Sequence, residues 1–359
     1  MLAQVEIRSP EQITTGWIND LLRGNGFEGG VESFQIAPIG SGQLAESRRL
    51  SLSYADGDGQ AGPASIVGKF PSTDAVSRET CRTLNLYRNE VLFYKELSAH
   101  AGIFVPPLLA ADVDPETHDF VLIFGDMSFC RAGNQLDGMS VDEGRWALRE
   151  AARLHASHWN DNALMKRPWI SVPQTAQDFY TTELVEQAWV QFRSLFSERI
   201  EPEIQEVCER FVKAHRMWNV PLDTPRCLTH NDFRPDNMLI DDAAGRIATV
   251  DWQTVNMLSS GMDVAYFIGG SMFTDDRRAH EQDLLNFYYD ELTGNGVRYY
   301  SFDQFFRDYR HYSFAGMAVA LAAIVLVKRT PRGDDMLLTM LERHARHVLD
   351  LNALQLLDG

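Results

Sequence analysis

Residues 230–237 carry polar groups at a spacing that suits phosphoryl transfer. The stretch reads HNDFRPDN, and Asp251 follows fourteen positions after Asn237, within the tripeptide Asp-Trp-Gln. In kinase chemistry an Asp takes the proton of the acceptor hydroxyl, while an Asn and a second Asp hold Mg²⁺ against the phosphates. The spacing therefore predicts Asp232 as the proton acceptor, with Asn237 and Asp251 as magnesium ligands.

Two further residues of this loop suit supporting roles. His230 precedes Asp232 by two positions, and we expect it to hold the loop through hydrogen bonds rather than to transfer protons. Arg234 follows Asp232 by two positions, where a cation could neutralise charge that develops on the transferred phosphoryl group. The alternative for Arg234 is an ordinary surface arginine.

Apolar segments on both sides of a turn frame the loop. Residues 238–240 and 247–250 are apolar and flank the turn 241–245, which predicts a β-hairpin that brings Asn237 and Asp251 close together. Asp263 lies further on, in Gly-Met-Asp-Val-Ala-Tyr, and we expect it to bond to the backbone of the catalytic loop as structural support.

A glycine-containing loop between the first two predicted strands is the candidate phosphate cradle. It comprises Gly40, Ser41, Gly42 and Gln43. Glycines allow backbone amides to approach a polyphosphate closely. An ordinary glycine turn in a hairpin would have the same pattern, so the loop is informative only in combination with residues later in the chain.

A lysine and a glutamate come after this loop in the order that kinases use. Lys69 ends the third predicted strand and Glu90 lies on the next predicted helix. In protein kinases a strand lysine contacts the donor phosphates and a helix glutamate pairs with it. The order of glycine loop, strand lysine, helix glutamate, short apolar strand and HxD loop predicts that Lys69 and Glu90 bind the nucleotide.

The N-terminal part of the chain has strand character. Ser9, Pro10 and Gln12 form a capping-box pattern that predicts a helix to about residue 23. Alternating or apolar segments then predict strands at 31–39, 47–54, 64–70 and 120–124, with a helix at 77–99.

The rest of the chain is predominantly helical. The predicted helices lie at 140–159, 174–196, 201–218, 276–293, 302–328 and 334–356. We therefore predict an α+β, protein-kinase-like two-lobe fold with a small antiparallel sheet and one main helix in the N-lobe, and a large helical C-lobe. The predicted parts are an N-terminal helical segment at 1–28, an N-lobe at 29–127 and a C-lobe at 128–359.

Composition restricts the partners. The 359 residues are 45% hydrophobic and carry a formal net charge of -17, which would repel nucleic acid and anionic membranes. The apolar segment 314–327 is shorter than the ~20 residues of a membrane span. Four scattered cysteines and an N-terminus without a basic, apolar leader favour reduced thiols and a cytoplasmic location.

Together these residues resemble the aminoglycoside phosphotransferase and choline kinase group of small-molecule kinases, and within it the ecdysteroid-kinase-like branch. The likeness covers most of the chain. Its landmarks are SGQ at 41–43, Lys69, YRNEVLFY at 87–94, LHASHW at 154–159, the catalytic loop, DWQ at 251–253 and GMDVAY at 261–266.

The resemblance implies ATP as the donor, Mg²⁺ as the cofactor and a hydroxylated small molecule as the acceptor. It also implies that adenine lies against the strand joining the lobes, which would place Phe124, Gly125, Asp126 and Met127 at the nucleotide. The chain departs from protein kinases in reading Asp-Trp-Gln for Asp-Phe-Gly and in lacking an Ala-Pro-Glu segment, which argues against a protein substrate.

Other functions stay open. A nucleotide-binding protein without transferase activity would need the same binding residues, although not Asp232. A kinase for protein amines or glycated lysines is a further alternative. The acidic charge suits a cationic acceptor, whereas the apolar C-terminal helices suit a sterol-like or aromatic alcohol. Trp252 and the aromatic residues at 299–309 could line the acceptor pocket or belong to the core, and oligomeric state is undetermined.

Overall fold

The chain forms two compact units, each with its own core. The structure is a computed structural model that describes residues 5–40, 44–55, 62–170, 181–219 and 222–358. The first unit contains Met1–His100, Val105–Cys130 and Thr249–Thr254, and the second contains Ala101–Phe104, Arg131–Ala248 and Val255–Gly359. Asp251 therefore belongs to the first unit, although the residues before and after its short segment belong to the second. The lobe limits drawn from the sequence stay predictions.

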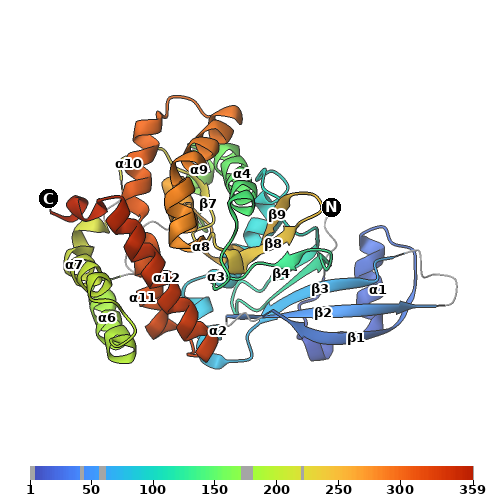
Figure 1. Cartoon of the computed structure of the whole chain (residues 1–359). Coiled ribbons are helices and arrows are strands. Elements are labelled where there is room, and N and C mark those ends of the chain that lie inside the picture. The colour runs from blue at the N-terminus through green and yellow to red at the C-terminus, as the bar shows by residue number, and fades with distance from the viewer. Residues whose placement is uncertain (1–4, 41–43, 56–61, 171–180, 220–221, 359) are drawn as a thin grey trace. The chain divides into compact units, whose positions relative to one another are not determined.

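A five-stranded antiparallel sheet is the framework of the first unit (Figure 1). Its spatial order is β1-β2-β3-β5-β4. The four strands predicted from the sequence are present, and one further strand was missed because the alanines at its centre have little strand preference. The strands are β1 (Val31–Ile39), β2 (Ala45–Tyr54), β3 (Ser65–Pro71), β4 (Leu108–Val113) and β5 (Phe120–Gly125).

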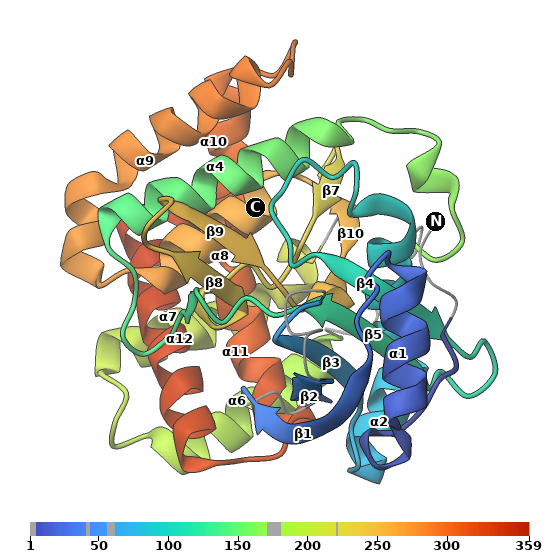
Figure 2. The ribbon, with the colours of Figure 1, turned by 90° about the vertical axis from the view of Figure 1, so that its right-hand side faces the viewer.

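Helix α1 (Thr15–Gly24) lies against this sheet (Figure 2). Its buried side chains, Trp17 and Leu21 among them, share an apolar core with residues of β1, β2, β3 and β5. The capping box predicted at Ser9 does form, but it closes only the short 3₁₀ turn Pro10–Gln12. The α-helix begins afresh where the Thr14 hydroxyl accepts the N–H of Trp17.

The helix predicted at 77–99 is broken in the structure. It consists of α2 (Ala75–Thr83), α3 (Leu86–Leu92) and the π-helical turn Phe93–Leu97. Asn85 separates α2 from α3 with a left-handed φ of 58°. Asparagine tolerates this conformation better than most residues, which is why the chain can turn there.

Helices dominate the second unit. They are α4 (Val141–Ser157), α6 (Thr182–Phe196), α7 (Pro202–Trp218), α8 (Gly261–Ser271), α9 (Thr274–Gly294), α10 (Phe302–Tyr312), α11 (Ala315–Leu326) and α12 (Pro331–Asp350). Helix α4 starts at the predicted capping box, in which the Ser140 hydroxyl accepts the Glu143 N–H. Helix α8 was not predicted because it is buried almost throughout and shows no polar face.

Two predicted helices end earlier than expected. The segment 302–328 is divided into α10 and α11 at residues 313–314, and α12 stops before Asn352, whose φ of 48° is left-handed. A 3₁₀ turn, Ala353–Leu357, completes the predicted segment 334–356. Part of the helix predicted at 174–196 lies outside the described residues, because 171–180 are not among them.

Short strands carry the segment around the catalytic loop. Strands β6 (Arg131–Ala132), β8 (Met238–Asp241) and β9 (Arg246–Thr249) form one small sheet in the order β6-β8-β9. Strands β7 (Cys227–Thr229) and β10 (Asn256–Leu258) form a second. The predicted hairpin after the catalytic loop is therefore confirmed as β8 and β9, while the proximity of Asn237 and Asp251 stays a prediction.

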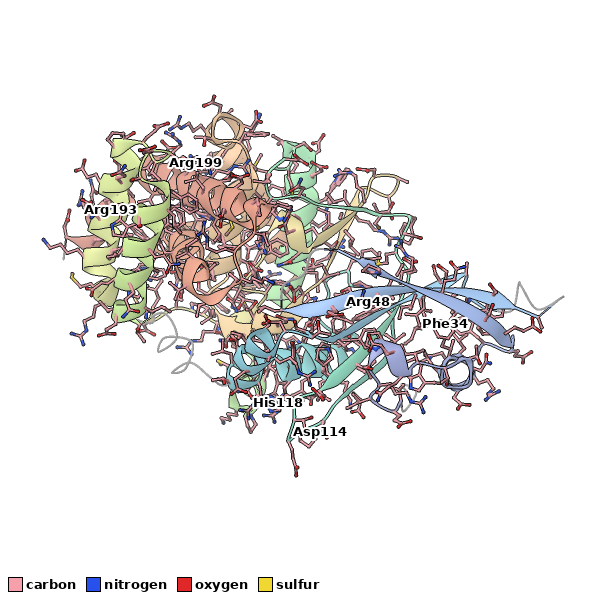
Figure 3. The ribbon with its side chains drawn as sticks, turned by 90° about the horizontal axis from the view of Figure 1, so that it is seen from below. Phe34, Arg48, Asp114, His118, Arg193 and Arg199 are labelled. Atoms are coloured by element: carbon pink, nitrogen blue, oxygen red, sulfur yellow. The ribbon has the colours of Figure 1, made fainter. Side chains whose placement is uncertain are left out.

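The helices α6, α7, α11 and α12 share one hydrophobic core. Exposed ion pairs border it, such as Arg193 with Glu209 at 3.0 Å and Arg199 with Asp335 at 2.9 Å (Figure 3). The aromatic residues near 300 are largely core as well, because Tyr300, Phe305 and Tyr309 are buried and in ring contact. At these three positions the core interpretation is the correct one.

One helical run among the described residues, Phe302–Leu326, is long and apolar enough to cross a membrane by length and composition. The segment was predicted to be too short, and the run gains its length because α10 leads directly into α11. Some 61% of its most apolar window is buried inside the fold. Core helices of soluble proteins pass the same test.

His215 should make the second unit sensitive to acid. Burial lowers the pKa of its imidazole from 6.5 to about 4, and neither ring nitrogen has a hydrogen-bond partner among the described residues. As pH falls from 6.5 towards 4, the unfolded chain binds a proton that the folded chain refuses, so stability decreases over that interval. We expect His215→Phe to flatten the fall in Tm between about pH 7 and about pH 5.

His100→Gln is the control, because His100 is exposed. Thermal unfolding at both pH values measures the effect. A fall in Tm that is equally steep in His215→Phe and in the parent protein would contradict this assignment.

Candidate active site

Lys69 joins two acidic residues in the first unit. Lys69 lies on β3, two residues before the strand ends. Its Nζ donates to Glu90 Oε1 and Oε2 at 2.8 and 2.7 Å and to Asp251 Oδ1 at 2.8 Å. Glu90, on α3, is 1% exposed and the Lys69 side chain 13%, so this pair is largely shielded from water. The structure thus brings together three of the residues that the sequence singled out.

Burial and charge act against each other in this group. Burial disfavours the Lys69 ammonium, but the charges of Asp251 and Glu90 outweigh it and raise the pKa of Lys69. Burial raises the pKa of the Glu90 carboxyl, whereas the Lys69 charge acts in the opposite direction. One ammonium faces two carboxylates, so with both ionised the group is net negative and suited to a further cation.

The residues after Asp251 are fixed to the helix that carries Glu90. The Trp252 ring is fully buried and stacks on Phe93 at 3.7 Å and 8°, and Gln253 hydrogen-bonds to Glu90. Trp252 is therefore part of the core and does not line an open pocket. Asp251 itself has a left-handed φ of 66°, a strained conformation for a non-glycine residue. These contacts hold it there.

The other predicted nucleotide contacts are only partly visible. Ser41, Gly42 and Gln43 lie outside the described residues, while Gly40 has a left-handed φ of 72° that favours glycine. This backbone suits a tight loop. Whether the loop cradles a phosphate stays a prediction.

The segment predicted to contact adenine, Phe124 to Met127, hydrogen-bonds to other parts of the first unit. Gly125 N–H donates to the carbonyl of Pro107 at 2.8 Å, and the Met127 carbonyl accepts Cys130 N–H at 2.9 Å. The Asp126 carboxylate accepts Arg49 Nε at 2.7 Å and Ser65 Oγ at 2.5 Å. Phe124 and Met127 are buried. The contact of this segment with adenine stays a prediction.

Asp263 supports the catalytic loop in the second unit. Its carboxylate is fully buried on α8 and accepts the backbone N–H of His230 at 2.7 Å and of Asn231 at 2.8 Å. Burial would raise the pKa of Asp263, but His155, His230 and these hydrogen bonds outweigh it and lower the pKa. The predicted supporting role of Asp263 is confirmed.

His155 completes this arrangement from α4. Its Nε2 lies 3.2 Å from Asp263 Oδ2 and its Nδ1 lies 2.7 Å from the Tyr288 hydroxyl. The sequence shows no acidic partner near His155, because Asp263 is 108 residues away. The structure supplies that partner. Its role is packing and support, as expected from the helical spacing.

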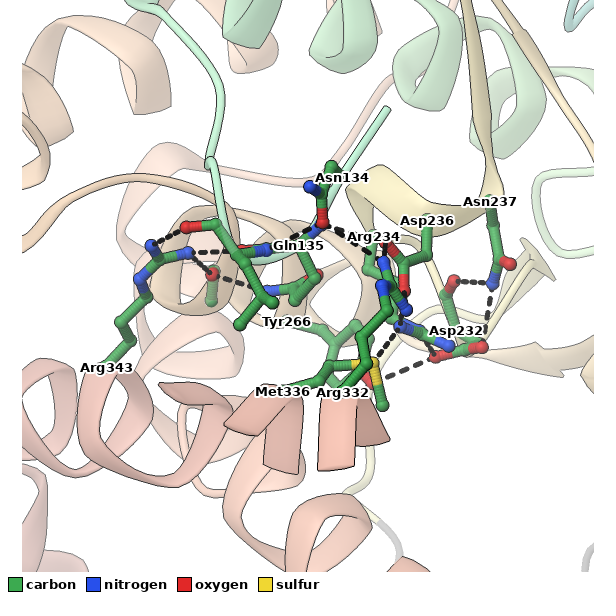
Figure 4. Close-up of polar contacts among 12 residues, drawn as sticks. Asn134, Gln135, Asp232, Arg234, Asp236, Asn237, Tyr266, Arg332, Met336 and Arg343 are labelled. Atoms are coloured by element: carbon green, nitrogen blue, oxygen red, sulfur yellow. Dashed lines mark hydrogen bonds and ion pairs between the residues drawn. The ribbon is translucent and has the colours of Figure 1, made fainter. Parts of the chain in front are cut away.

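The Asp232 carboxylate is surrounded by donors (Figure 4). Its Oδ1 accepts Arg234 Nε at 2.9 Å and the Tyr266 hydroxyl at 2.9 Å, and its Oδ2 accepts Asn237 Nδ2 at 2.7 Å. His230 is fully buried, and its Nδ1 accepts the Asp232 N–H at 3.2 Å, in keeping with the predicted structural role. The loop therefore presents Asp232 in a defined orientation.

Asp236, which the sequence did not single out, anchors Arg234. The Asp236 carboxylate pairs with Arg234 at 3.2 Å and Arg332 at 3.1 Å, and accepts Gln135 N–H at 2.8 Å (Figure 4). Burial acts to raise the pKa of Asp236, but Arg234 and these bonds lower it. Arg234 is thus a partly buried, doubly paired cation, 18% exposed, and not an ordinary surface arginine. The spacing of two residues between Arg234 and Asp236 is the sequence feature that could have predicted this ion pair.

The predicted metal ligands have suitable chemistry. Asn237 uses Nδ2 for Asp232, which leaves its amide oxygen as the atom able to bind a cation. Asp251 supplies a carboxylate whose side chain is 40% exposed. Mg²⁺ prefers oxygen ligands and often takes only one or two from protein, the rest from water and phosphate. Each residue therefore offers an oxygen of the kind that Mg²⁺ prefers, Asn237 in the second unit and Asp251 in the first.

Solved structures of small-molecule kinases have the same fold. Amicoumacin kinase is 12% identical with a TM-score of 0.53 and covers 91% of this chain and 92% of its own. Aminoglycoside 2'-phosphotransferase-IIIa is 13% identical with a TM-score of 0.52, and the match covers 94% of this chain and 100% of that one. Plasmodium vivax ethanolamine kinase is 11% identical with a TM-score of 0.50, and the match covers 91% of this chain and 87% of that one. At such identities the likeness concerns the fold, and it confirms the predicted kinase-like α+β architecture.

The chain belongs to the ecdysteroid kinase-like family, whose family model matches residues 44–297. An uncharacterized kinase-like protein of Caenorhabditis elegans, D1044.1, is 26% identical over 154 residues, which span 41% of this chain and 41% of that relative. The resemblance stated from the sequence motifs is confirmed.

The stack of Trp252 on Phe93 should contribute strongly to the stability of the first unit. We expect Trp252→Ala to lower the free energy of unfolding by about 3–5 kcal/mol, because it leaves a cavity beside a buried ring. Trp252→Phe, which retains an aromatic face, should lose clearly less. Denaturant unfolding measures both variants, and an unchanged midpoint in Trp252→Ala would refute the structural role of the stack.

Proposed function

We propose that this protein transfers the γ-phosphoryl group of MgATP to a hydroxyl group of a small molecule. The observation that carries the proposal is the bonding of Lys69 to both Glu90 and Asp251. In kinases the strand lysine must be paired with its helix glutamate, and the metal-binding Asp must be in place, before transfer occurs. The family and the fold support the same chemistry.

Each residue has a role in this reaction. Lys69 would contact the donor phosphates, Glu90 would orient Lys69, and Asn237 and Asp251 would hold Mg²⁺, which neutralises phosphate charge when bound. Asp232 takes the proton of the acceptor hydroxyl as its oxygen bonds to the γ-phosphorus and the bond to the ADP oxygen breaks. Arg234 would stabilise charge on the transferred group. Catalysis is then mainly positioning and electrostatics.

The acceptor is proposed to be a small alcohol. The printed names of the structural neighbours refer to ethanolamine, amicoumacin and aminoglycosides, and the family name refers to ecdysteroids. The net charge of -17 favours a cationic or neutral acceptor over an anionic one. These considerations define the compounds to be screened.

Asp232→Asn should abolish transfer while the nucleotide still binds. We expect turnover to fall by ~10²–10⁴-fold, because the proton acceptor is lost whereas the donor-binding residues are intact. The measurement is ADP release and product mass with MgATP and a panel of amino alcohols, aminoglycosides and sterols. Asp276→Asn, an exposed change on α9, is the control. Undiminished transfer by Asp232→Asn would eliminate the assignment.

Asp251→Asn should instead weaken nucleotide binding in a magnesium-dependent way. The loss of one carboxylate removes a metal ligand, so we expect titration calorimetry to show weaker ATP binding with Mg²⁺ and a smaller difference between assays with Mg²⁺ and with EDTA. Identical MgATP affinity in the variant and the parent would exclude Asp251 as a ligand. MgATP binding without transfer to any acceptor would favour the regulatory alternative.

A further inference from the structure

The two oxygens of the Asp232 carboxylate are not equivalent. Each carboxylate oxygen has two lone pairs. Oδ1 accepts two hydrogen bonds, from Arg234 Nε and from the Tyr266 hydroxyl, whereas Oδ2 accepts one, from Asn237 Nδ2, among the residues that the structure describes. Oδ2 is therefore the oxygen with a lone pair available to an incoming hydroxyl group.

Tyr266 is held firmly in the position that creates this difference. It is 1% exposed and lies on α8, three residues after Asp263, so one helix supports both the loop backbone and the Asp232 side chain. Its ring stacks on His344 at 5.5 Å and 26°. A Cβ atom at Gly269, Gly270 or Gly316 would collide with the His344 ring. The close packing around His344 therefore restricts movement of the Tyr266 ring.

We propose that Tyr266 is a positioning residue for the reaction. It orients the Asp232 carboxylate because, together with Arg234, it occupies Oδ1. Oδ2 is then the atom that takes the proton from the acceptor hydroxyl. This inference rests on the proposed function. It adds Tyr266, which contacts neither the metal nor the phosphate donor in that proposal. It also assigns the proton of the acceptor hydroxyl to Oδ2 of Asp232.

The consequence is a fixed direction of proton transfer. Rotation of the carboxylate about its Cβ–Cγ bond would break three side-chain hydrogen bonds, two to Oδ1 and one to Oδ2. Hydrogen bonds to a charged group are among the stronger ones in proteins, so the observed orientation is strongly favoured. Without the Tyr266 hydroxyl, Oδ1 gains a vacant lone pair and either oxygen can accept a proton, from the acceptor or from water.

A purely structural role for this hydroxyl must be separated from positioning, since buried tyrosine hydroxyls usually find a partner anyway. Tyr309 offers a matched control. It is fully buried in the same unit, and its hydroxyl also donates to a carboxylate, Glu281 Oε1, at 2.7 Å, and lies 2.7 Å from His347 Nε2. Tyr309→Phe thus removes a comparable hydrogen bond that does not involve the catalytic loop.

The test compares Tyr266→Phe, Tyr309→Phe and the parent protein, with MgATP alone and with MgATP plus the acceptor found by the panel. We expect Tyr266→Phe to lower kcat for transfer by about tenfold, the equivalent of one such bond, with KM for MgATP unchanged. The fraction of ADP formed without phosphorylated acceptor should rise, because water competes at a less restricted carboxylate. Thermal unfolding reports the stability of both variants.

The outcomes are distinct. Suppose that Tyr266→Phe has the same kcat as the parent and forms no more ADP without phosphorylated acceptor. This result would overturn the positioning role and leave the proposed function intact. An equal loss of kcat and coupling in Tyr309→Phe would show that the hydroxyl acts through stability, which also overturns it. If the parent neither hydrolyses MgATP nor phosphorylates any acceptor, the proposed function itself fails.

Discussion

The buried carboxylate of Asp263 is the interaction on which the catalytic loop depends. A carboxylate removed from water is costly unless hydrogen bonds and opposite charge compensate it. Here two consecutive backbone N–H groups, of His230 and Asn231, and the imidazole of His155 supply that compensation. The two parts stabilise each other: the N–H groups of the loop compensate the buried charge of Asp263, and the Asp263 carboxylate fixes the backbone of the loop. Asp232 comes immediately after Asn231, so its orientation derives from this contact.

Helix α8 extends the same constraint to the Asp232 carboxylate. Asp263 and Tyr266 are three residues apart, nearly one helical turn, and therefore lie on the same side of the helix. One holds the backbone of the loop and the other holds the side chain of Asp232. The helix is buried on almost all sides, so it can serve as a rigid reference for both. This accounts for a buried, mostly apolar helix that carries two polar side chains which contact the loop.

The first unit follows a different electrostatic principle. Its central ammonium, on Lys69, is bonded to two carboxylates rather than one. Such a group holds its charges in place without neutralising them fully when both are ionised, which suits a site that must bind a cation together with phosphates. The stack of Trp252 on Phe93 ties the Asp251 segment to the helix that carries Glu90. Asp251, the proposed magnesium ligand, and Glu90, the partner of Lys69, are therefore linked through one helix.

The order of residues along the chain was sufficient to predict the pairing of Lys69 with Glu90, because their sequence context matches a known chemistry. The contact of Asp251 with Lys69 was not predicted. Four of the five strands of the sheet could also be predicted, from alternating or apolar segments. The break at Asn85 was not, since an asparagine can either continue a helix or adopt φ above zero. Strand β4 is defined by its pairing with β5 rather than by its own composition.

The sequence by itself determined the identity and spacing of the chemical groups, which is why the family and the class of reaction could be inferred from motifs. Only the tertiary structure decided which groups bond to one another. His155 meets Asp263 across 108 positions and Tyr266 meets Asp232 across 34, distances in sequence that no local pattern encodes. The reason is physical: hydrogen bonds depend on positions in space, and those are set by the packing of whole helices.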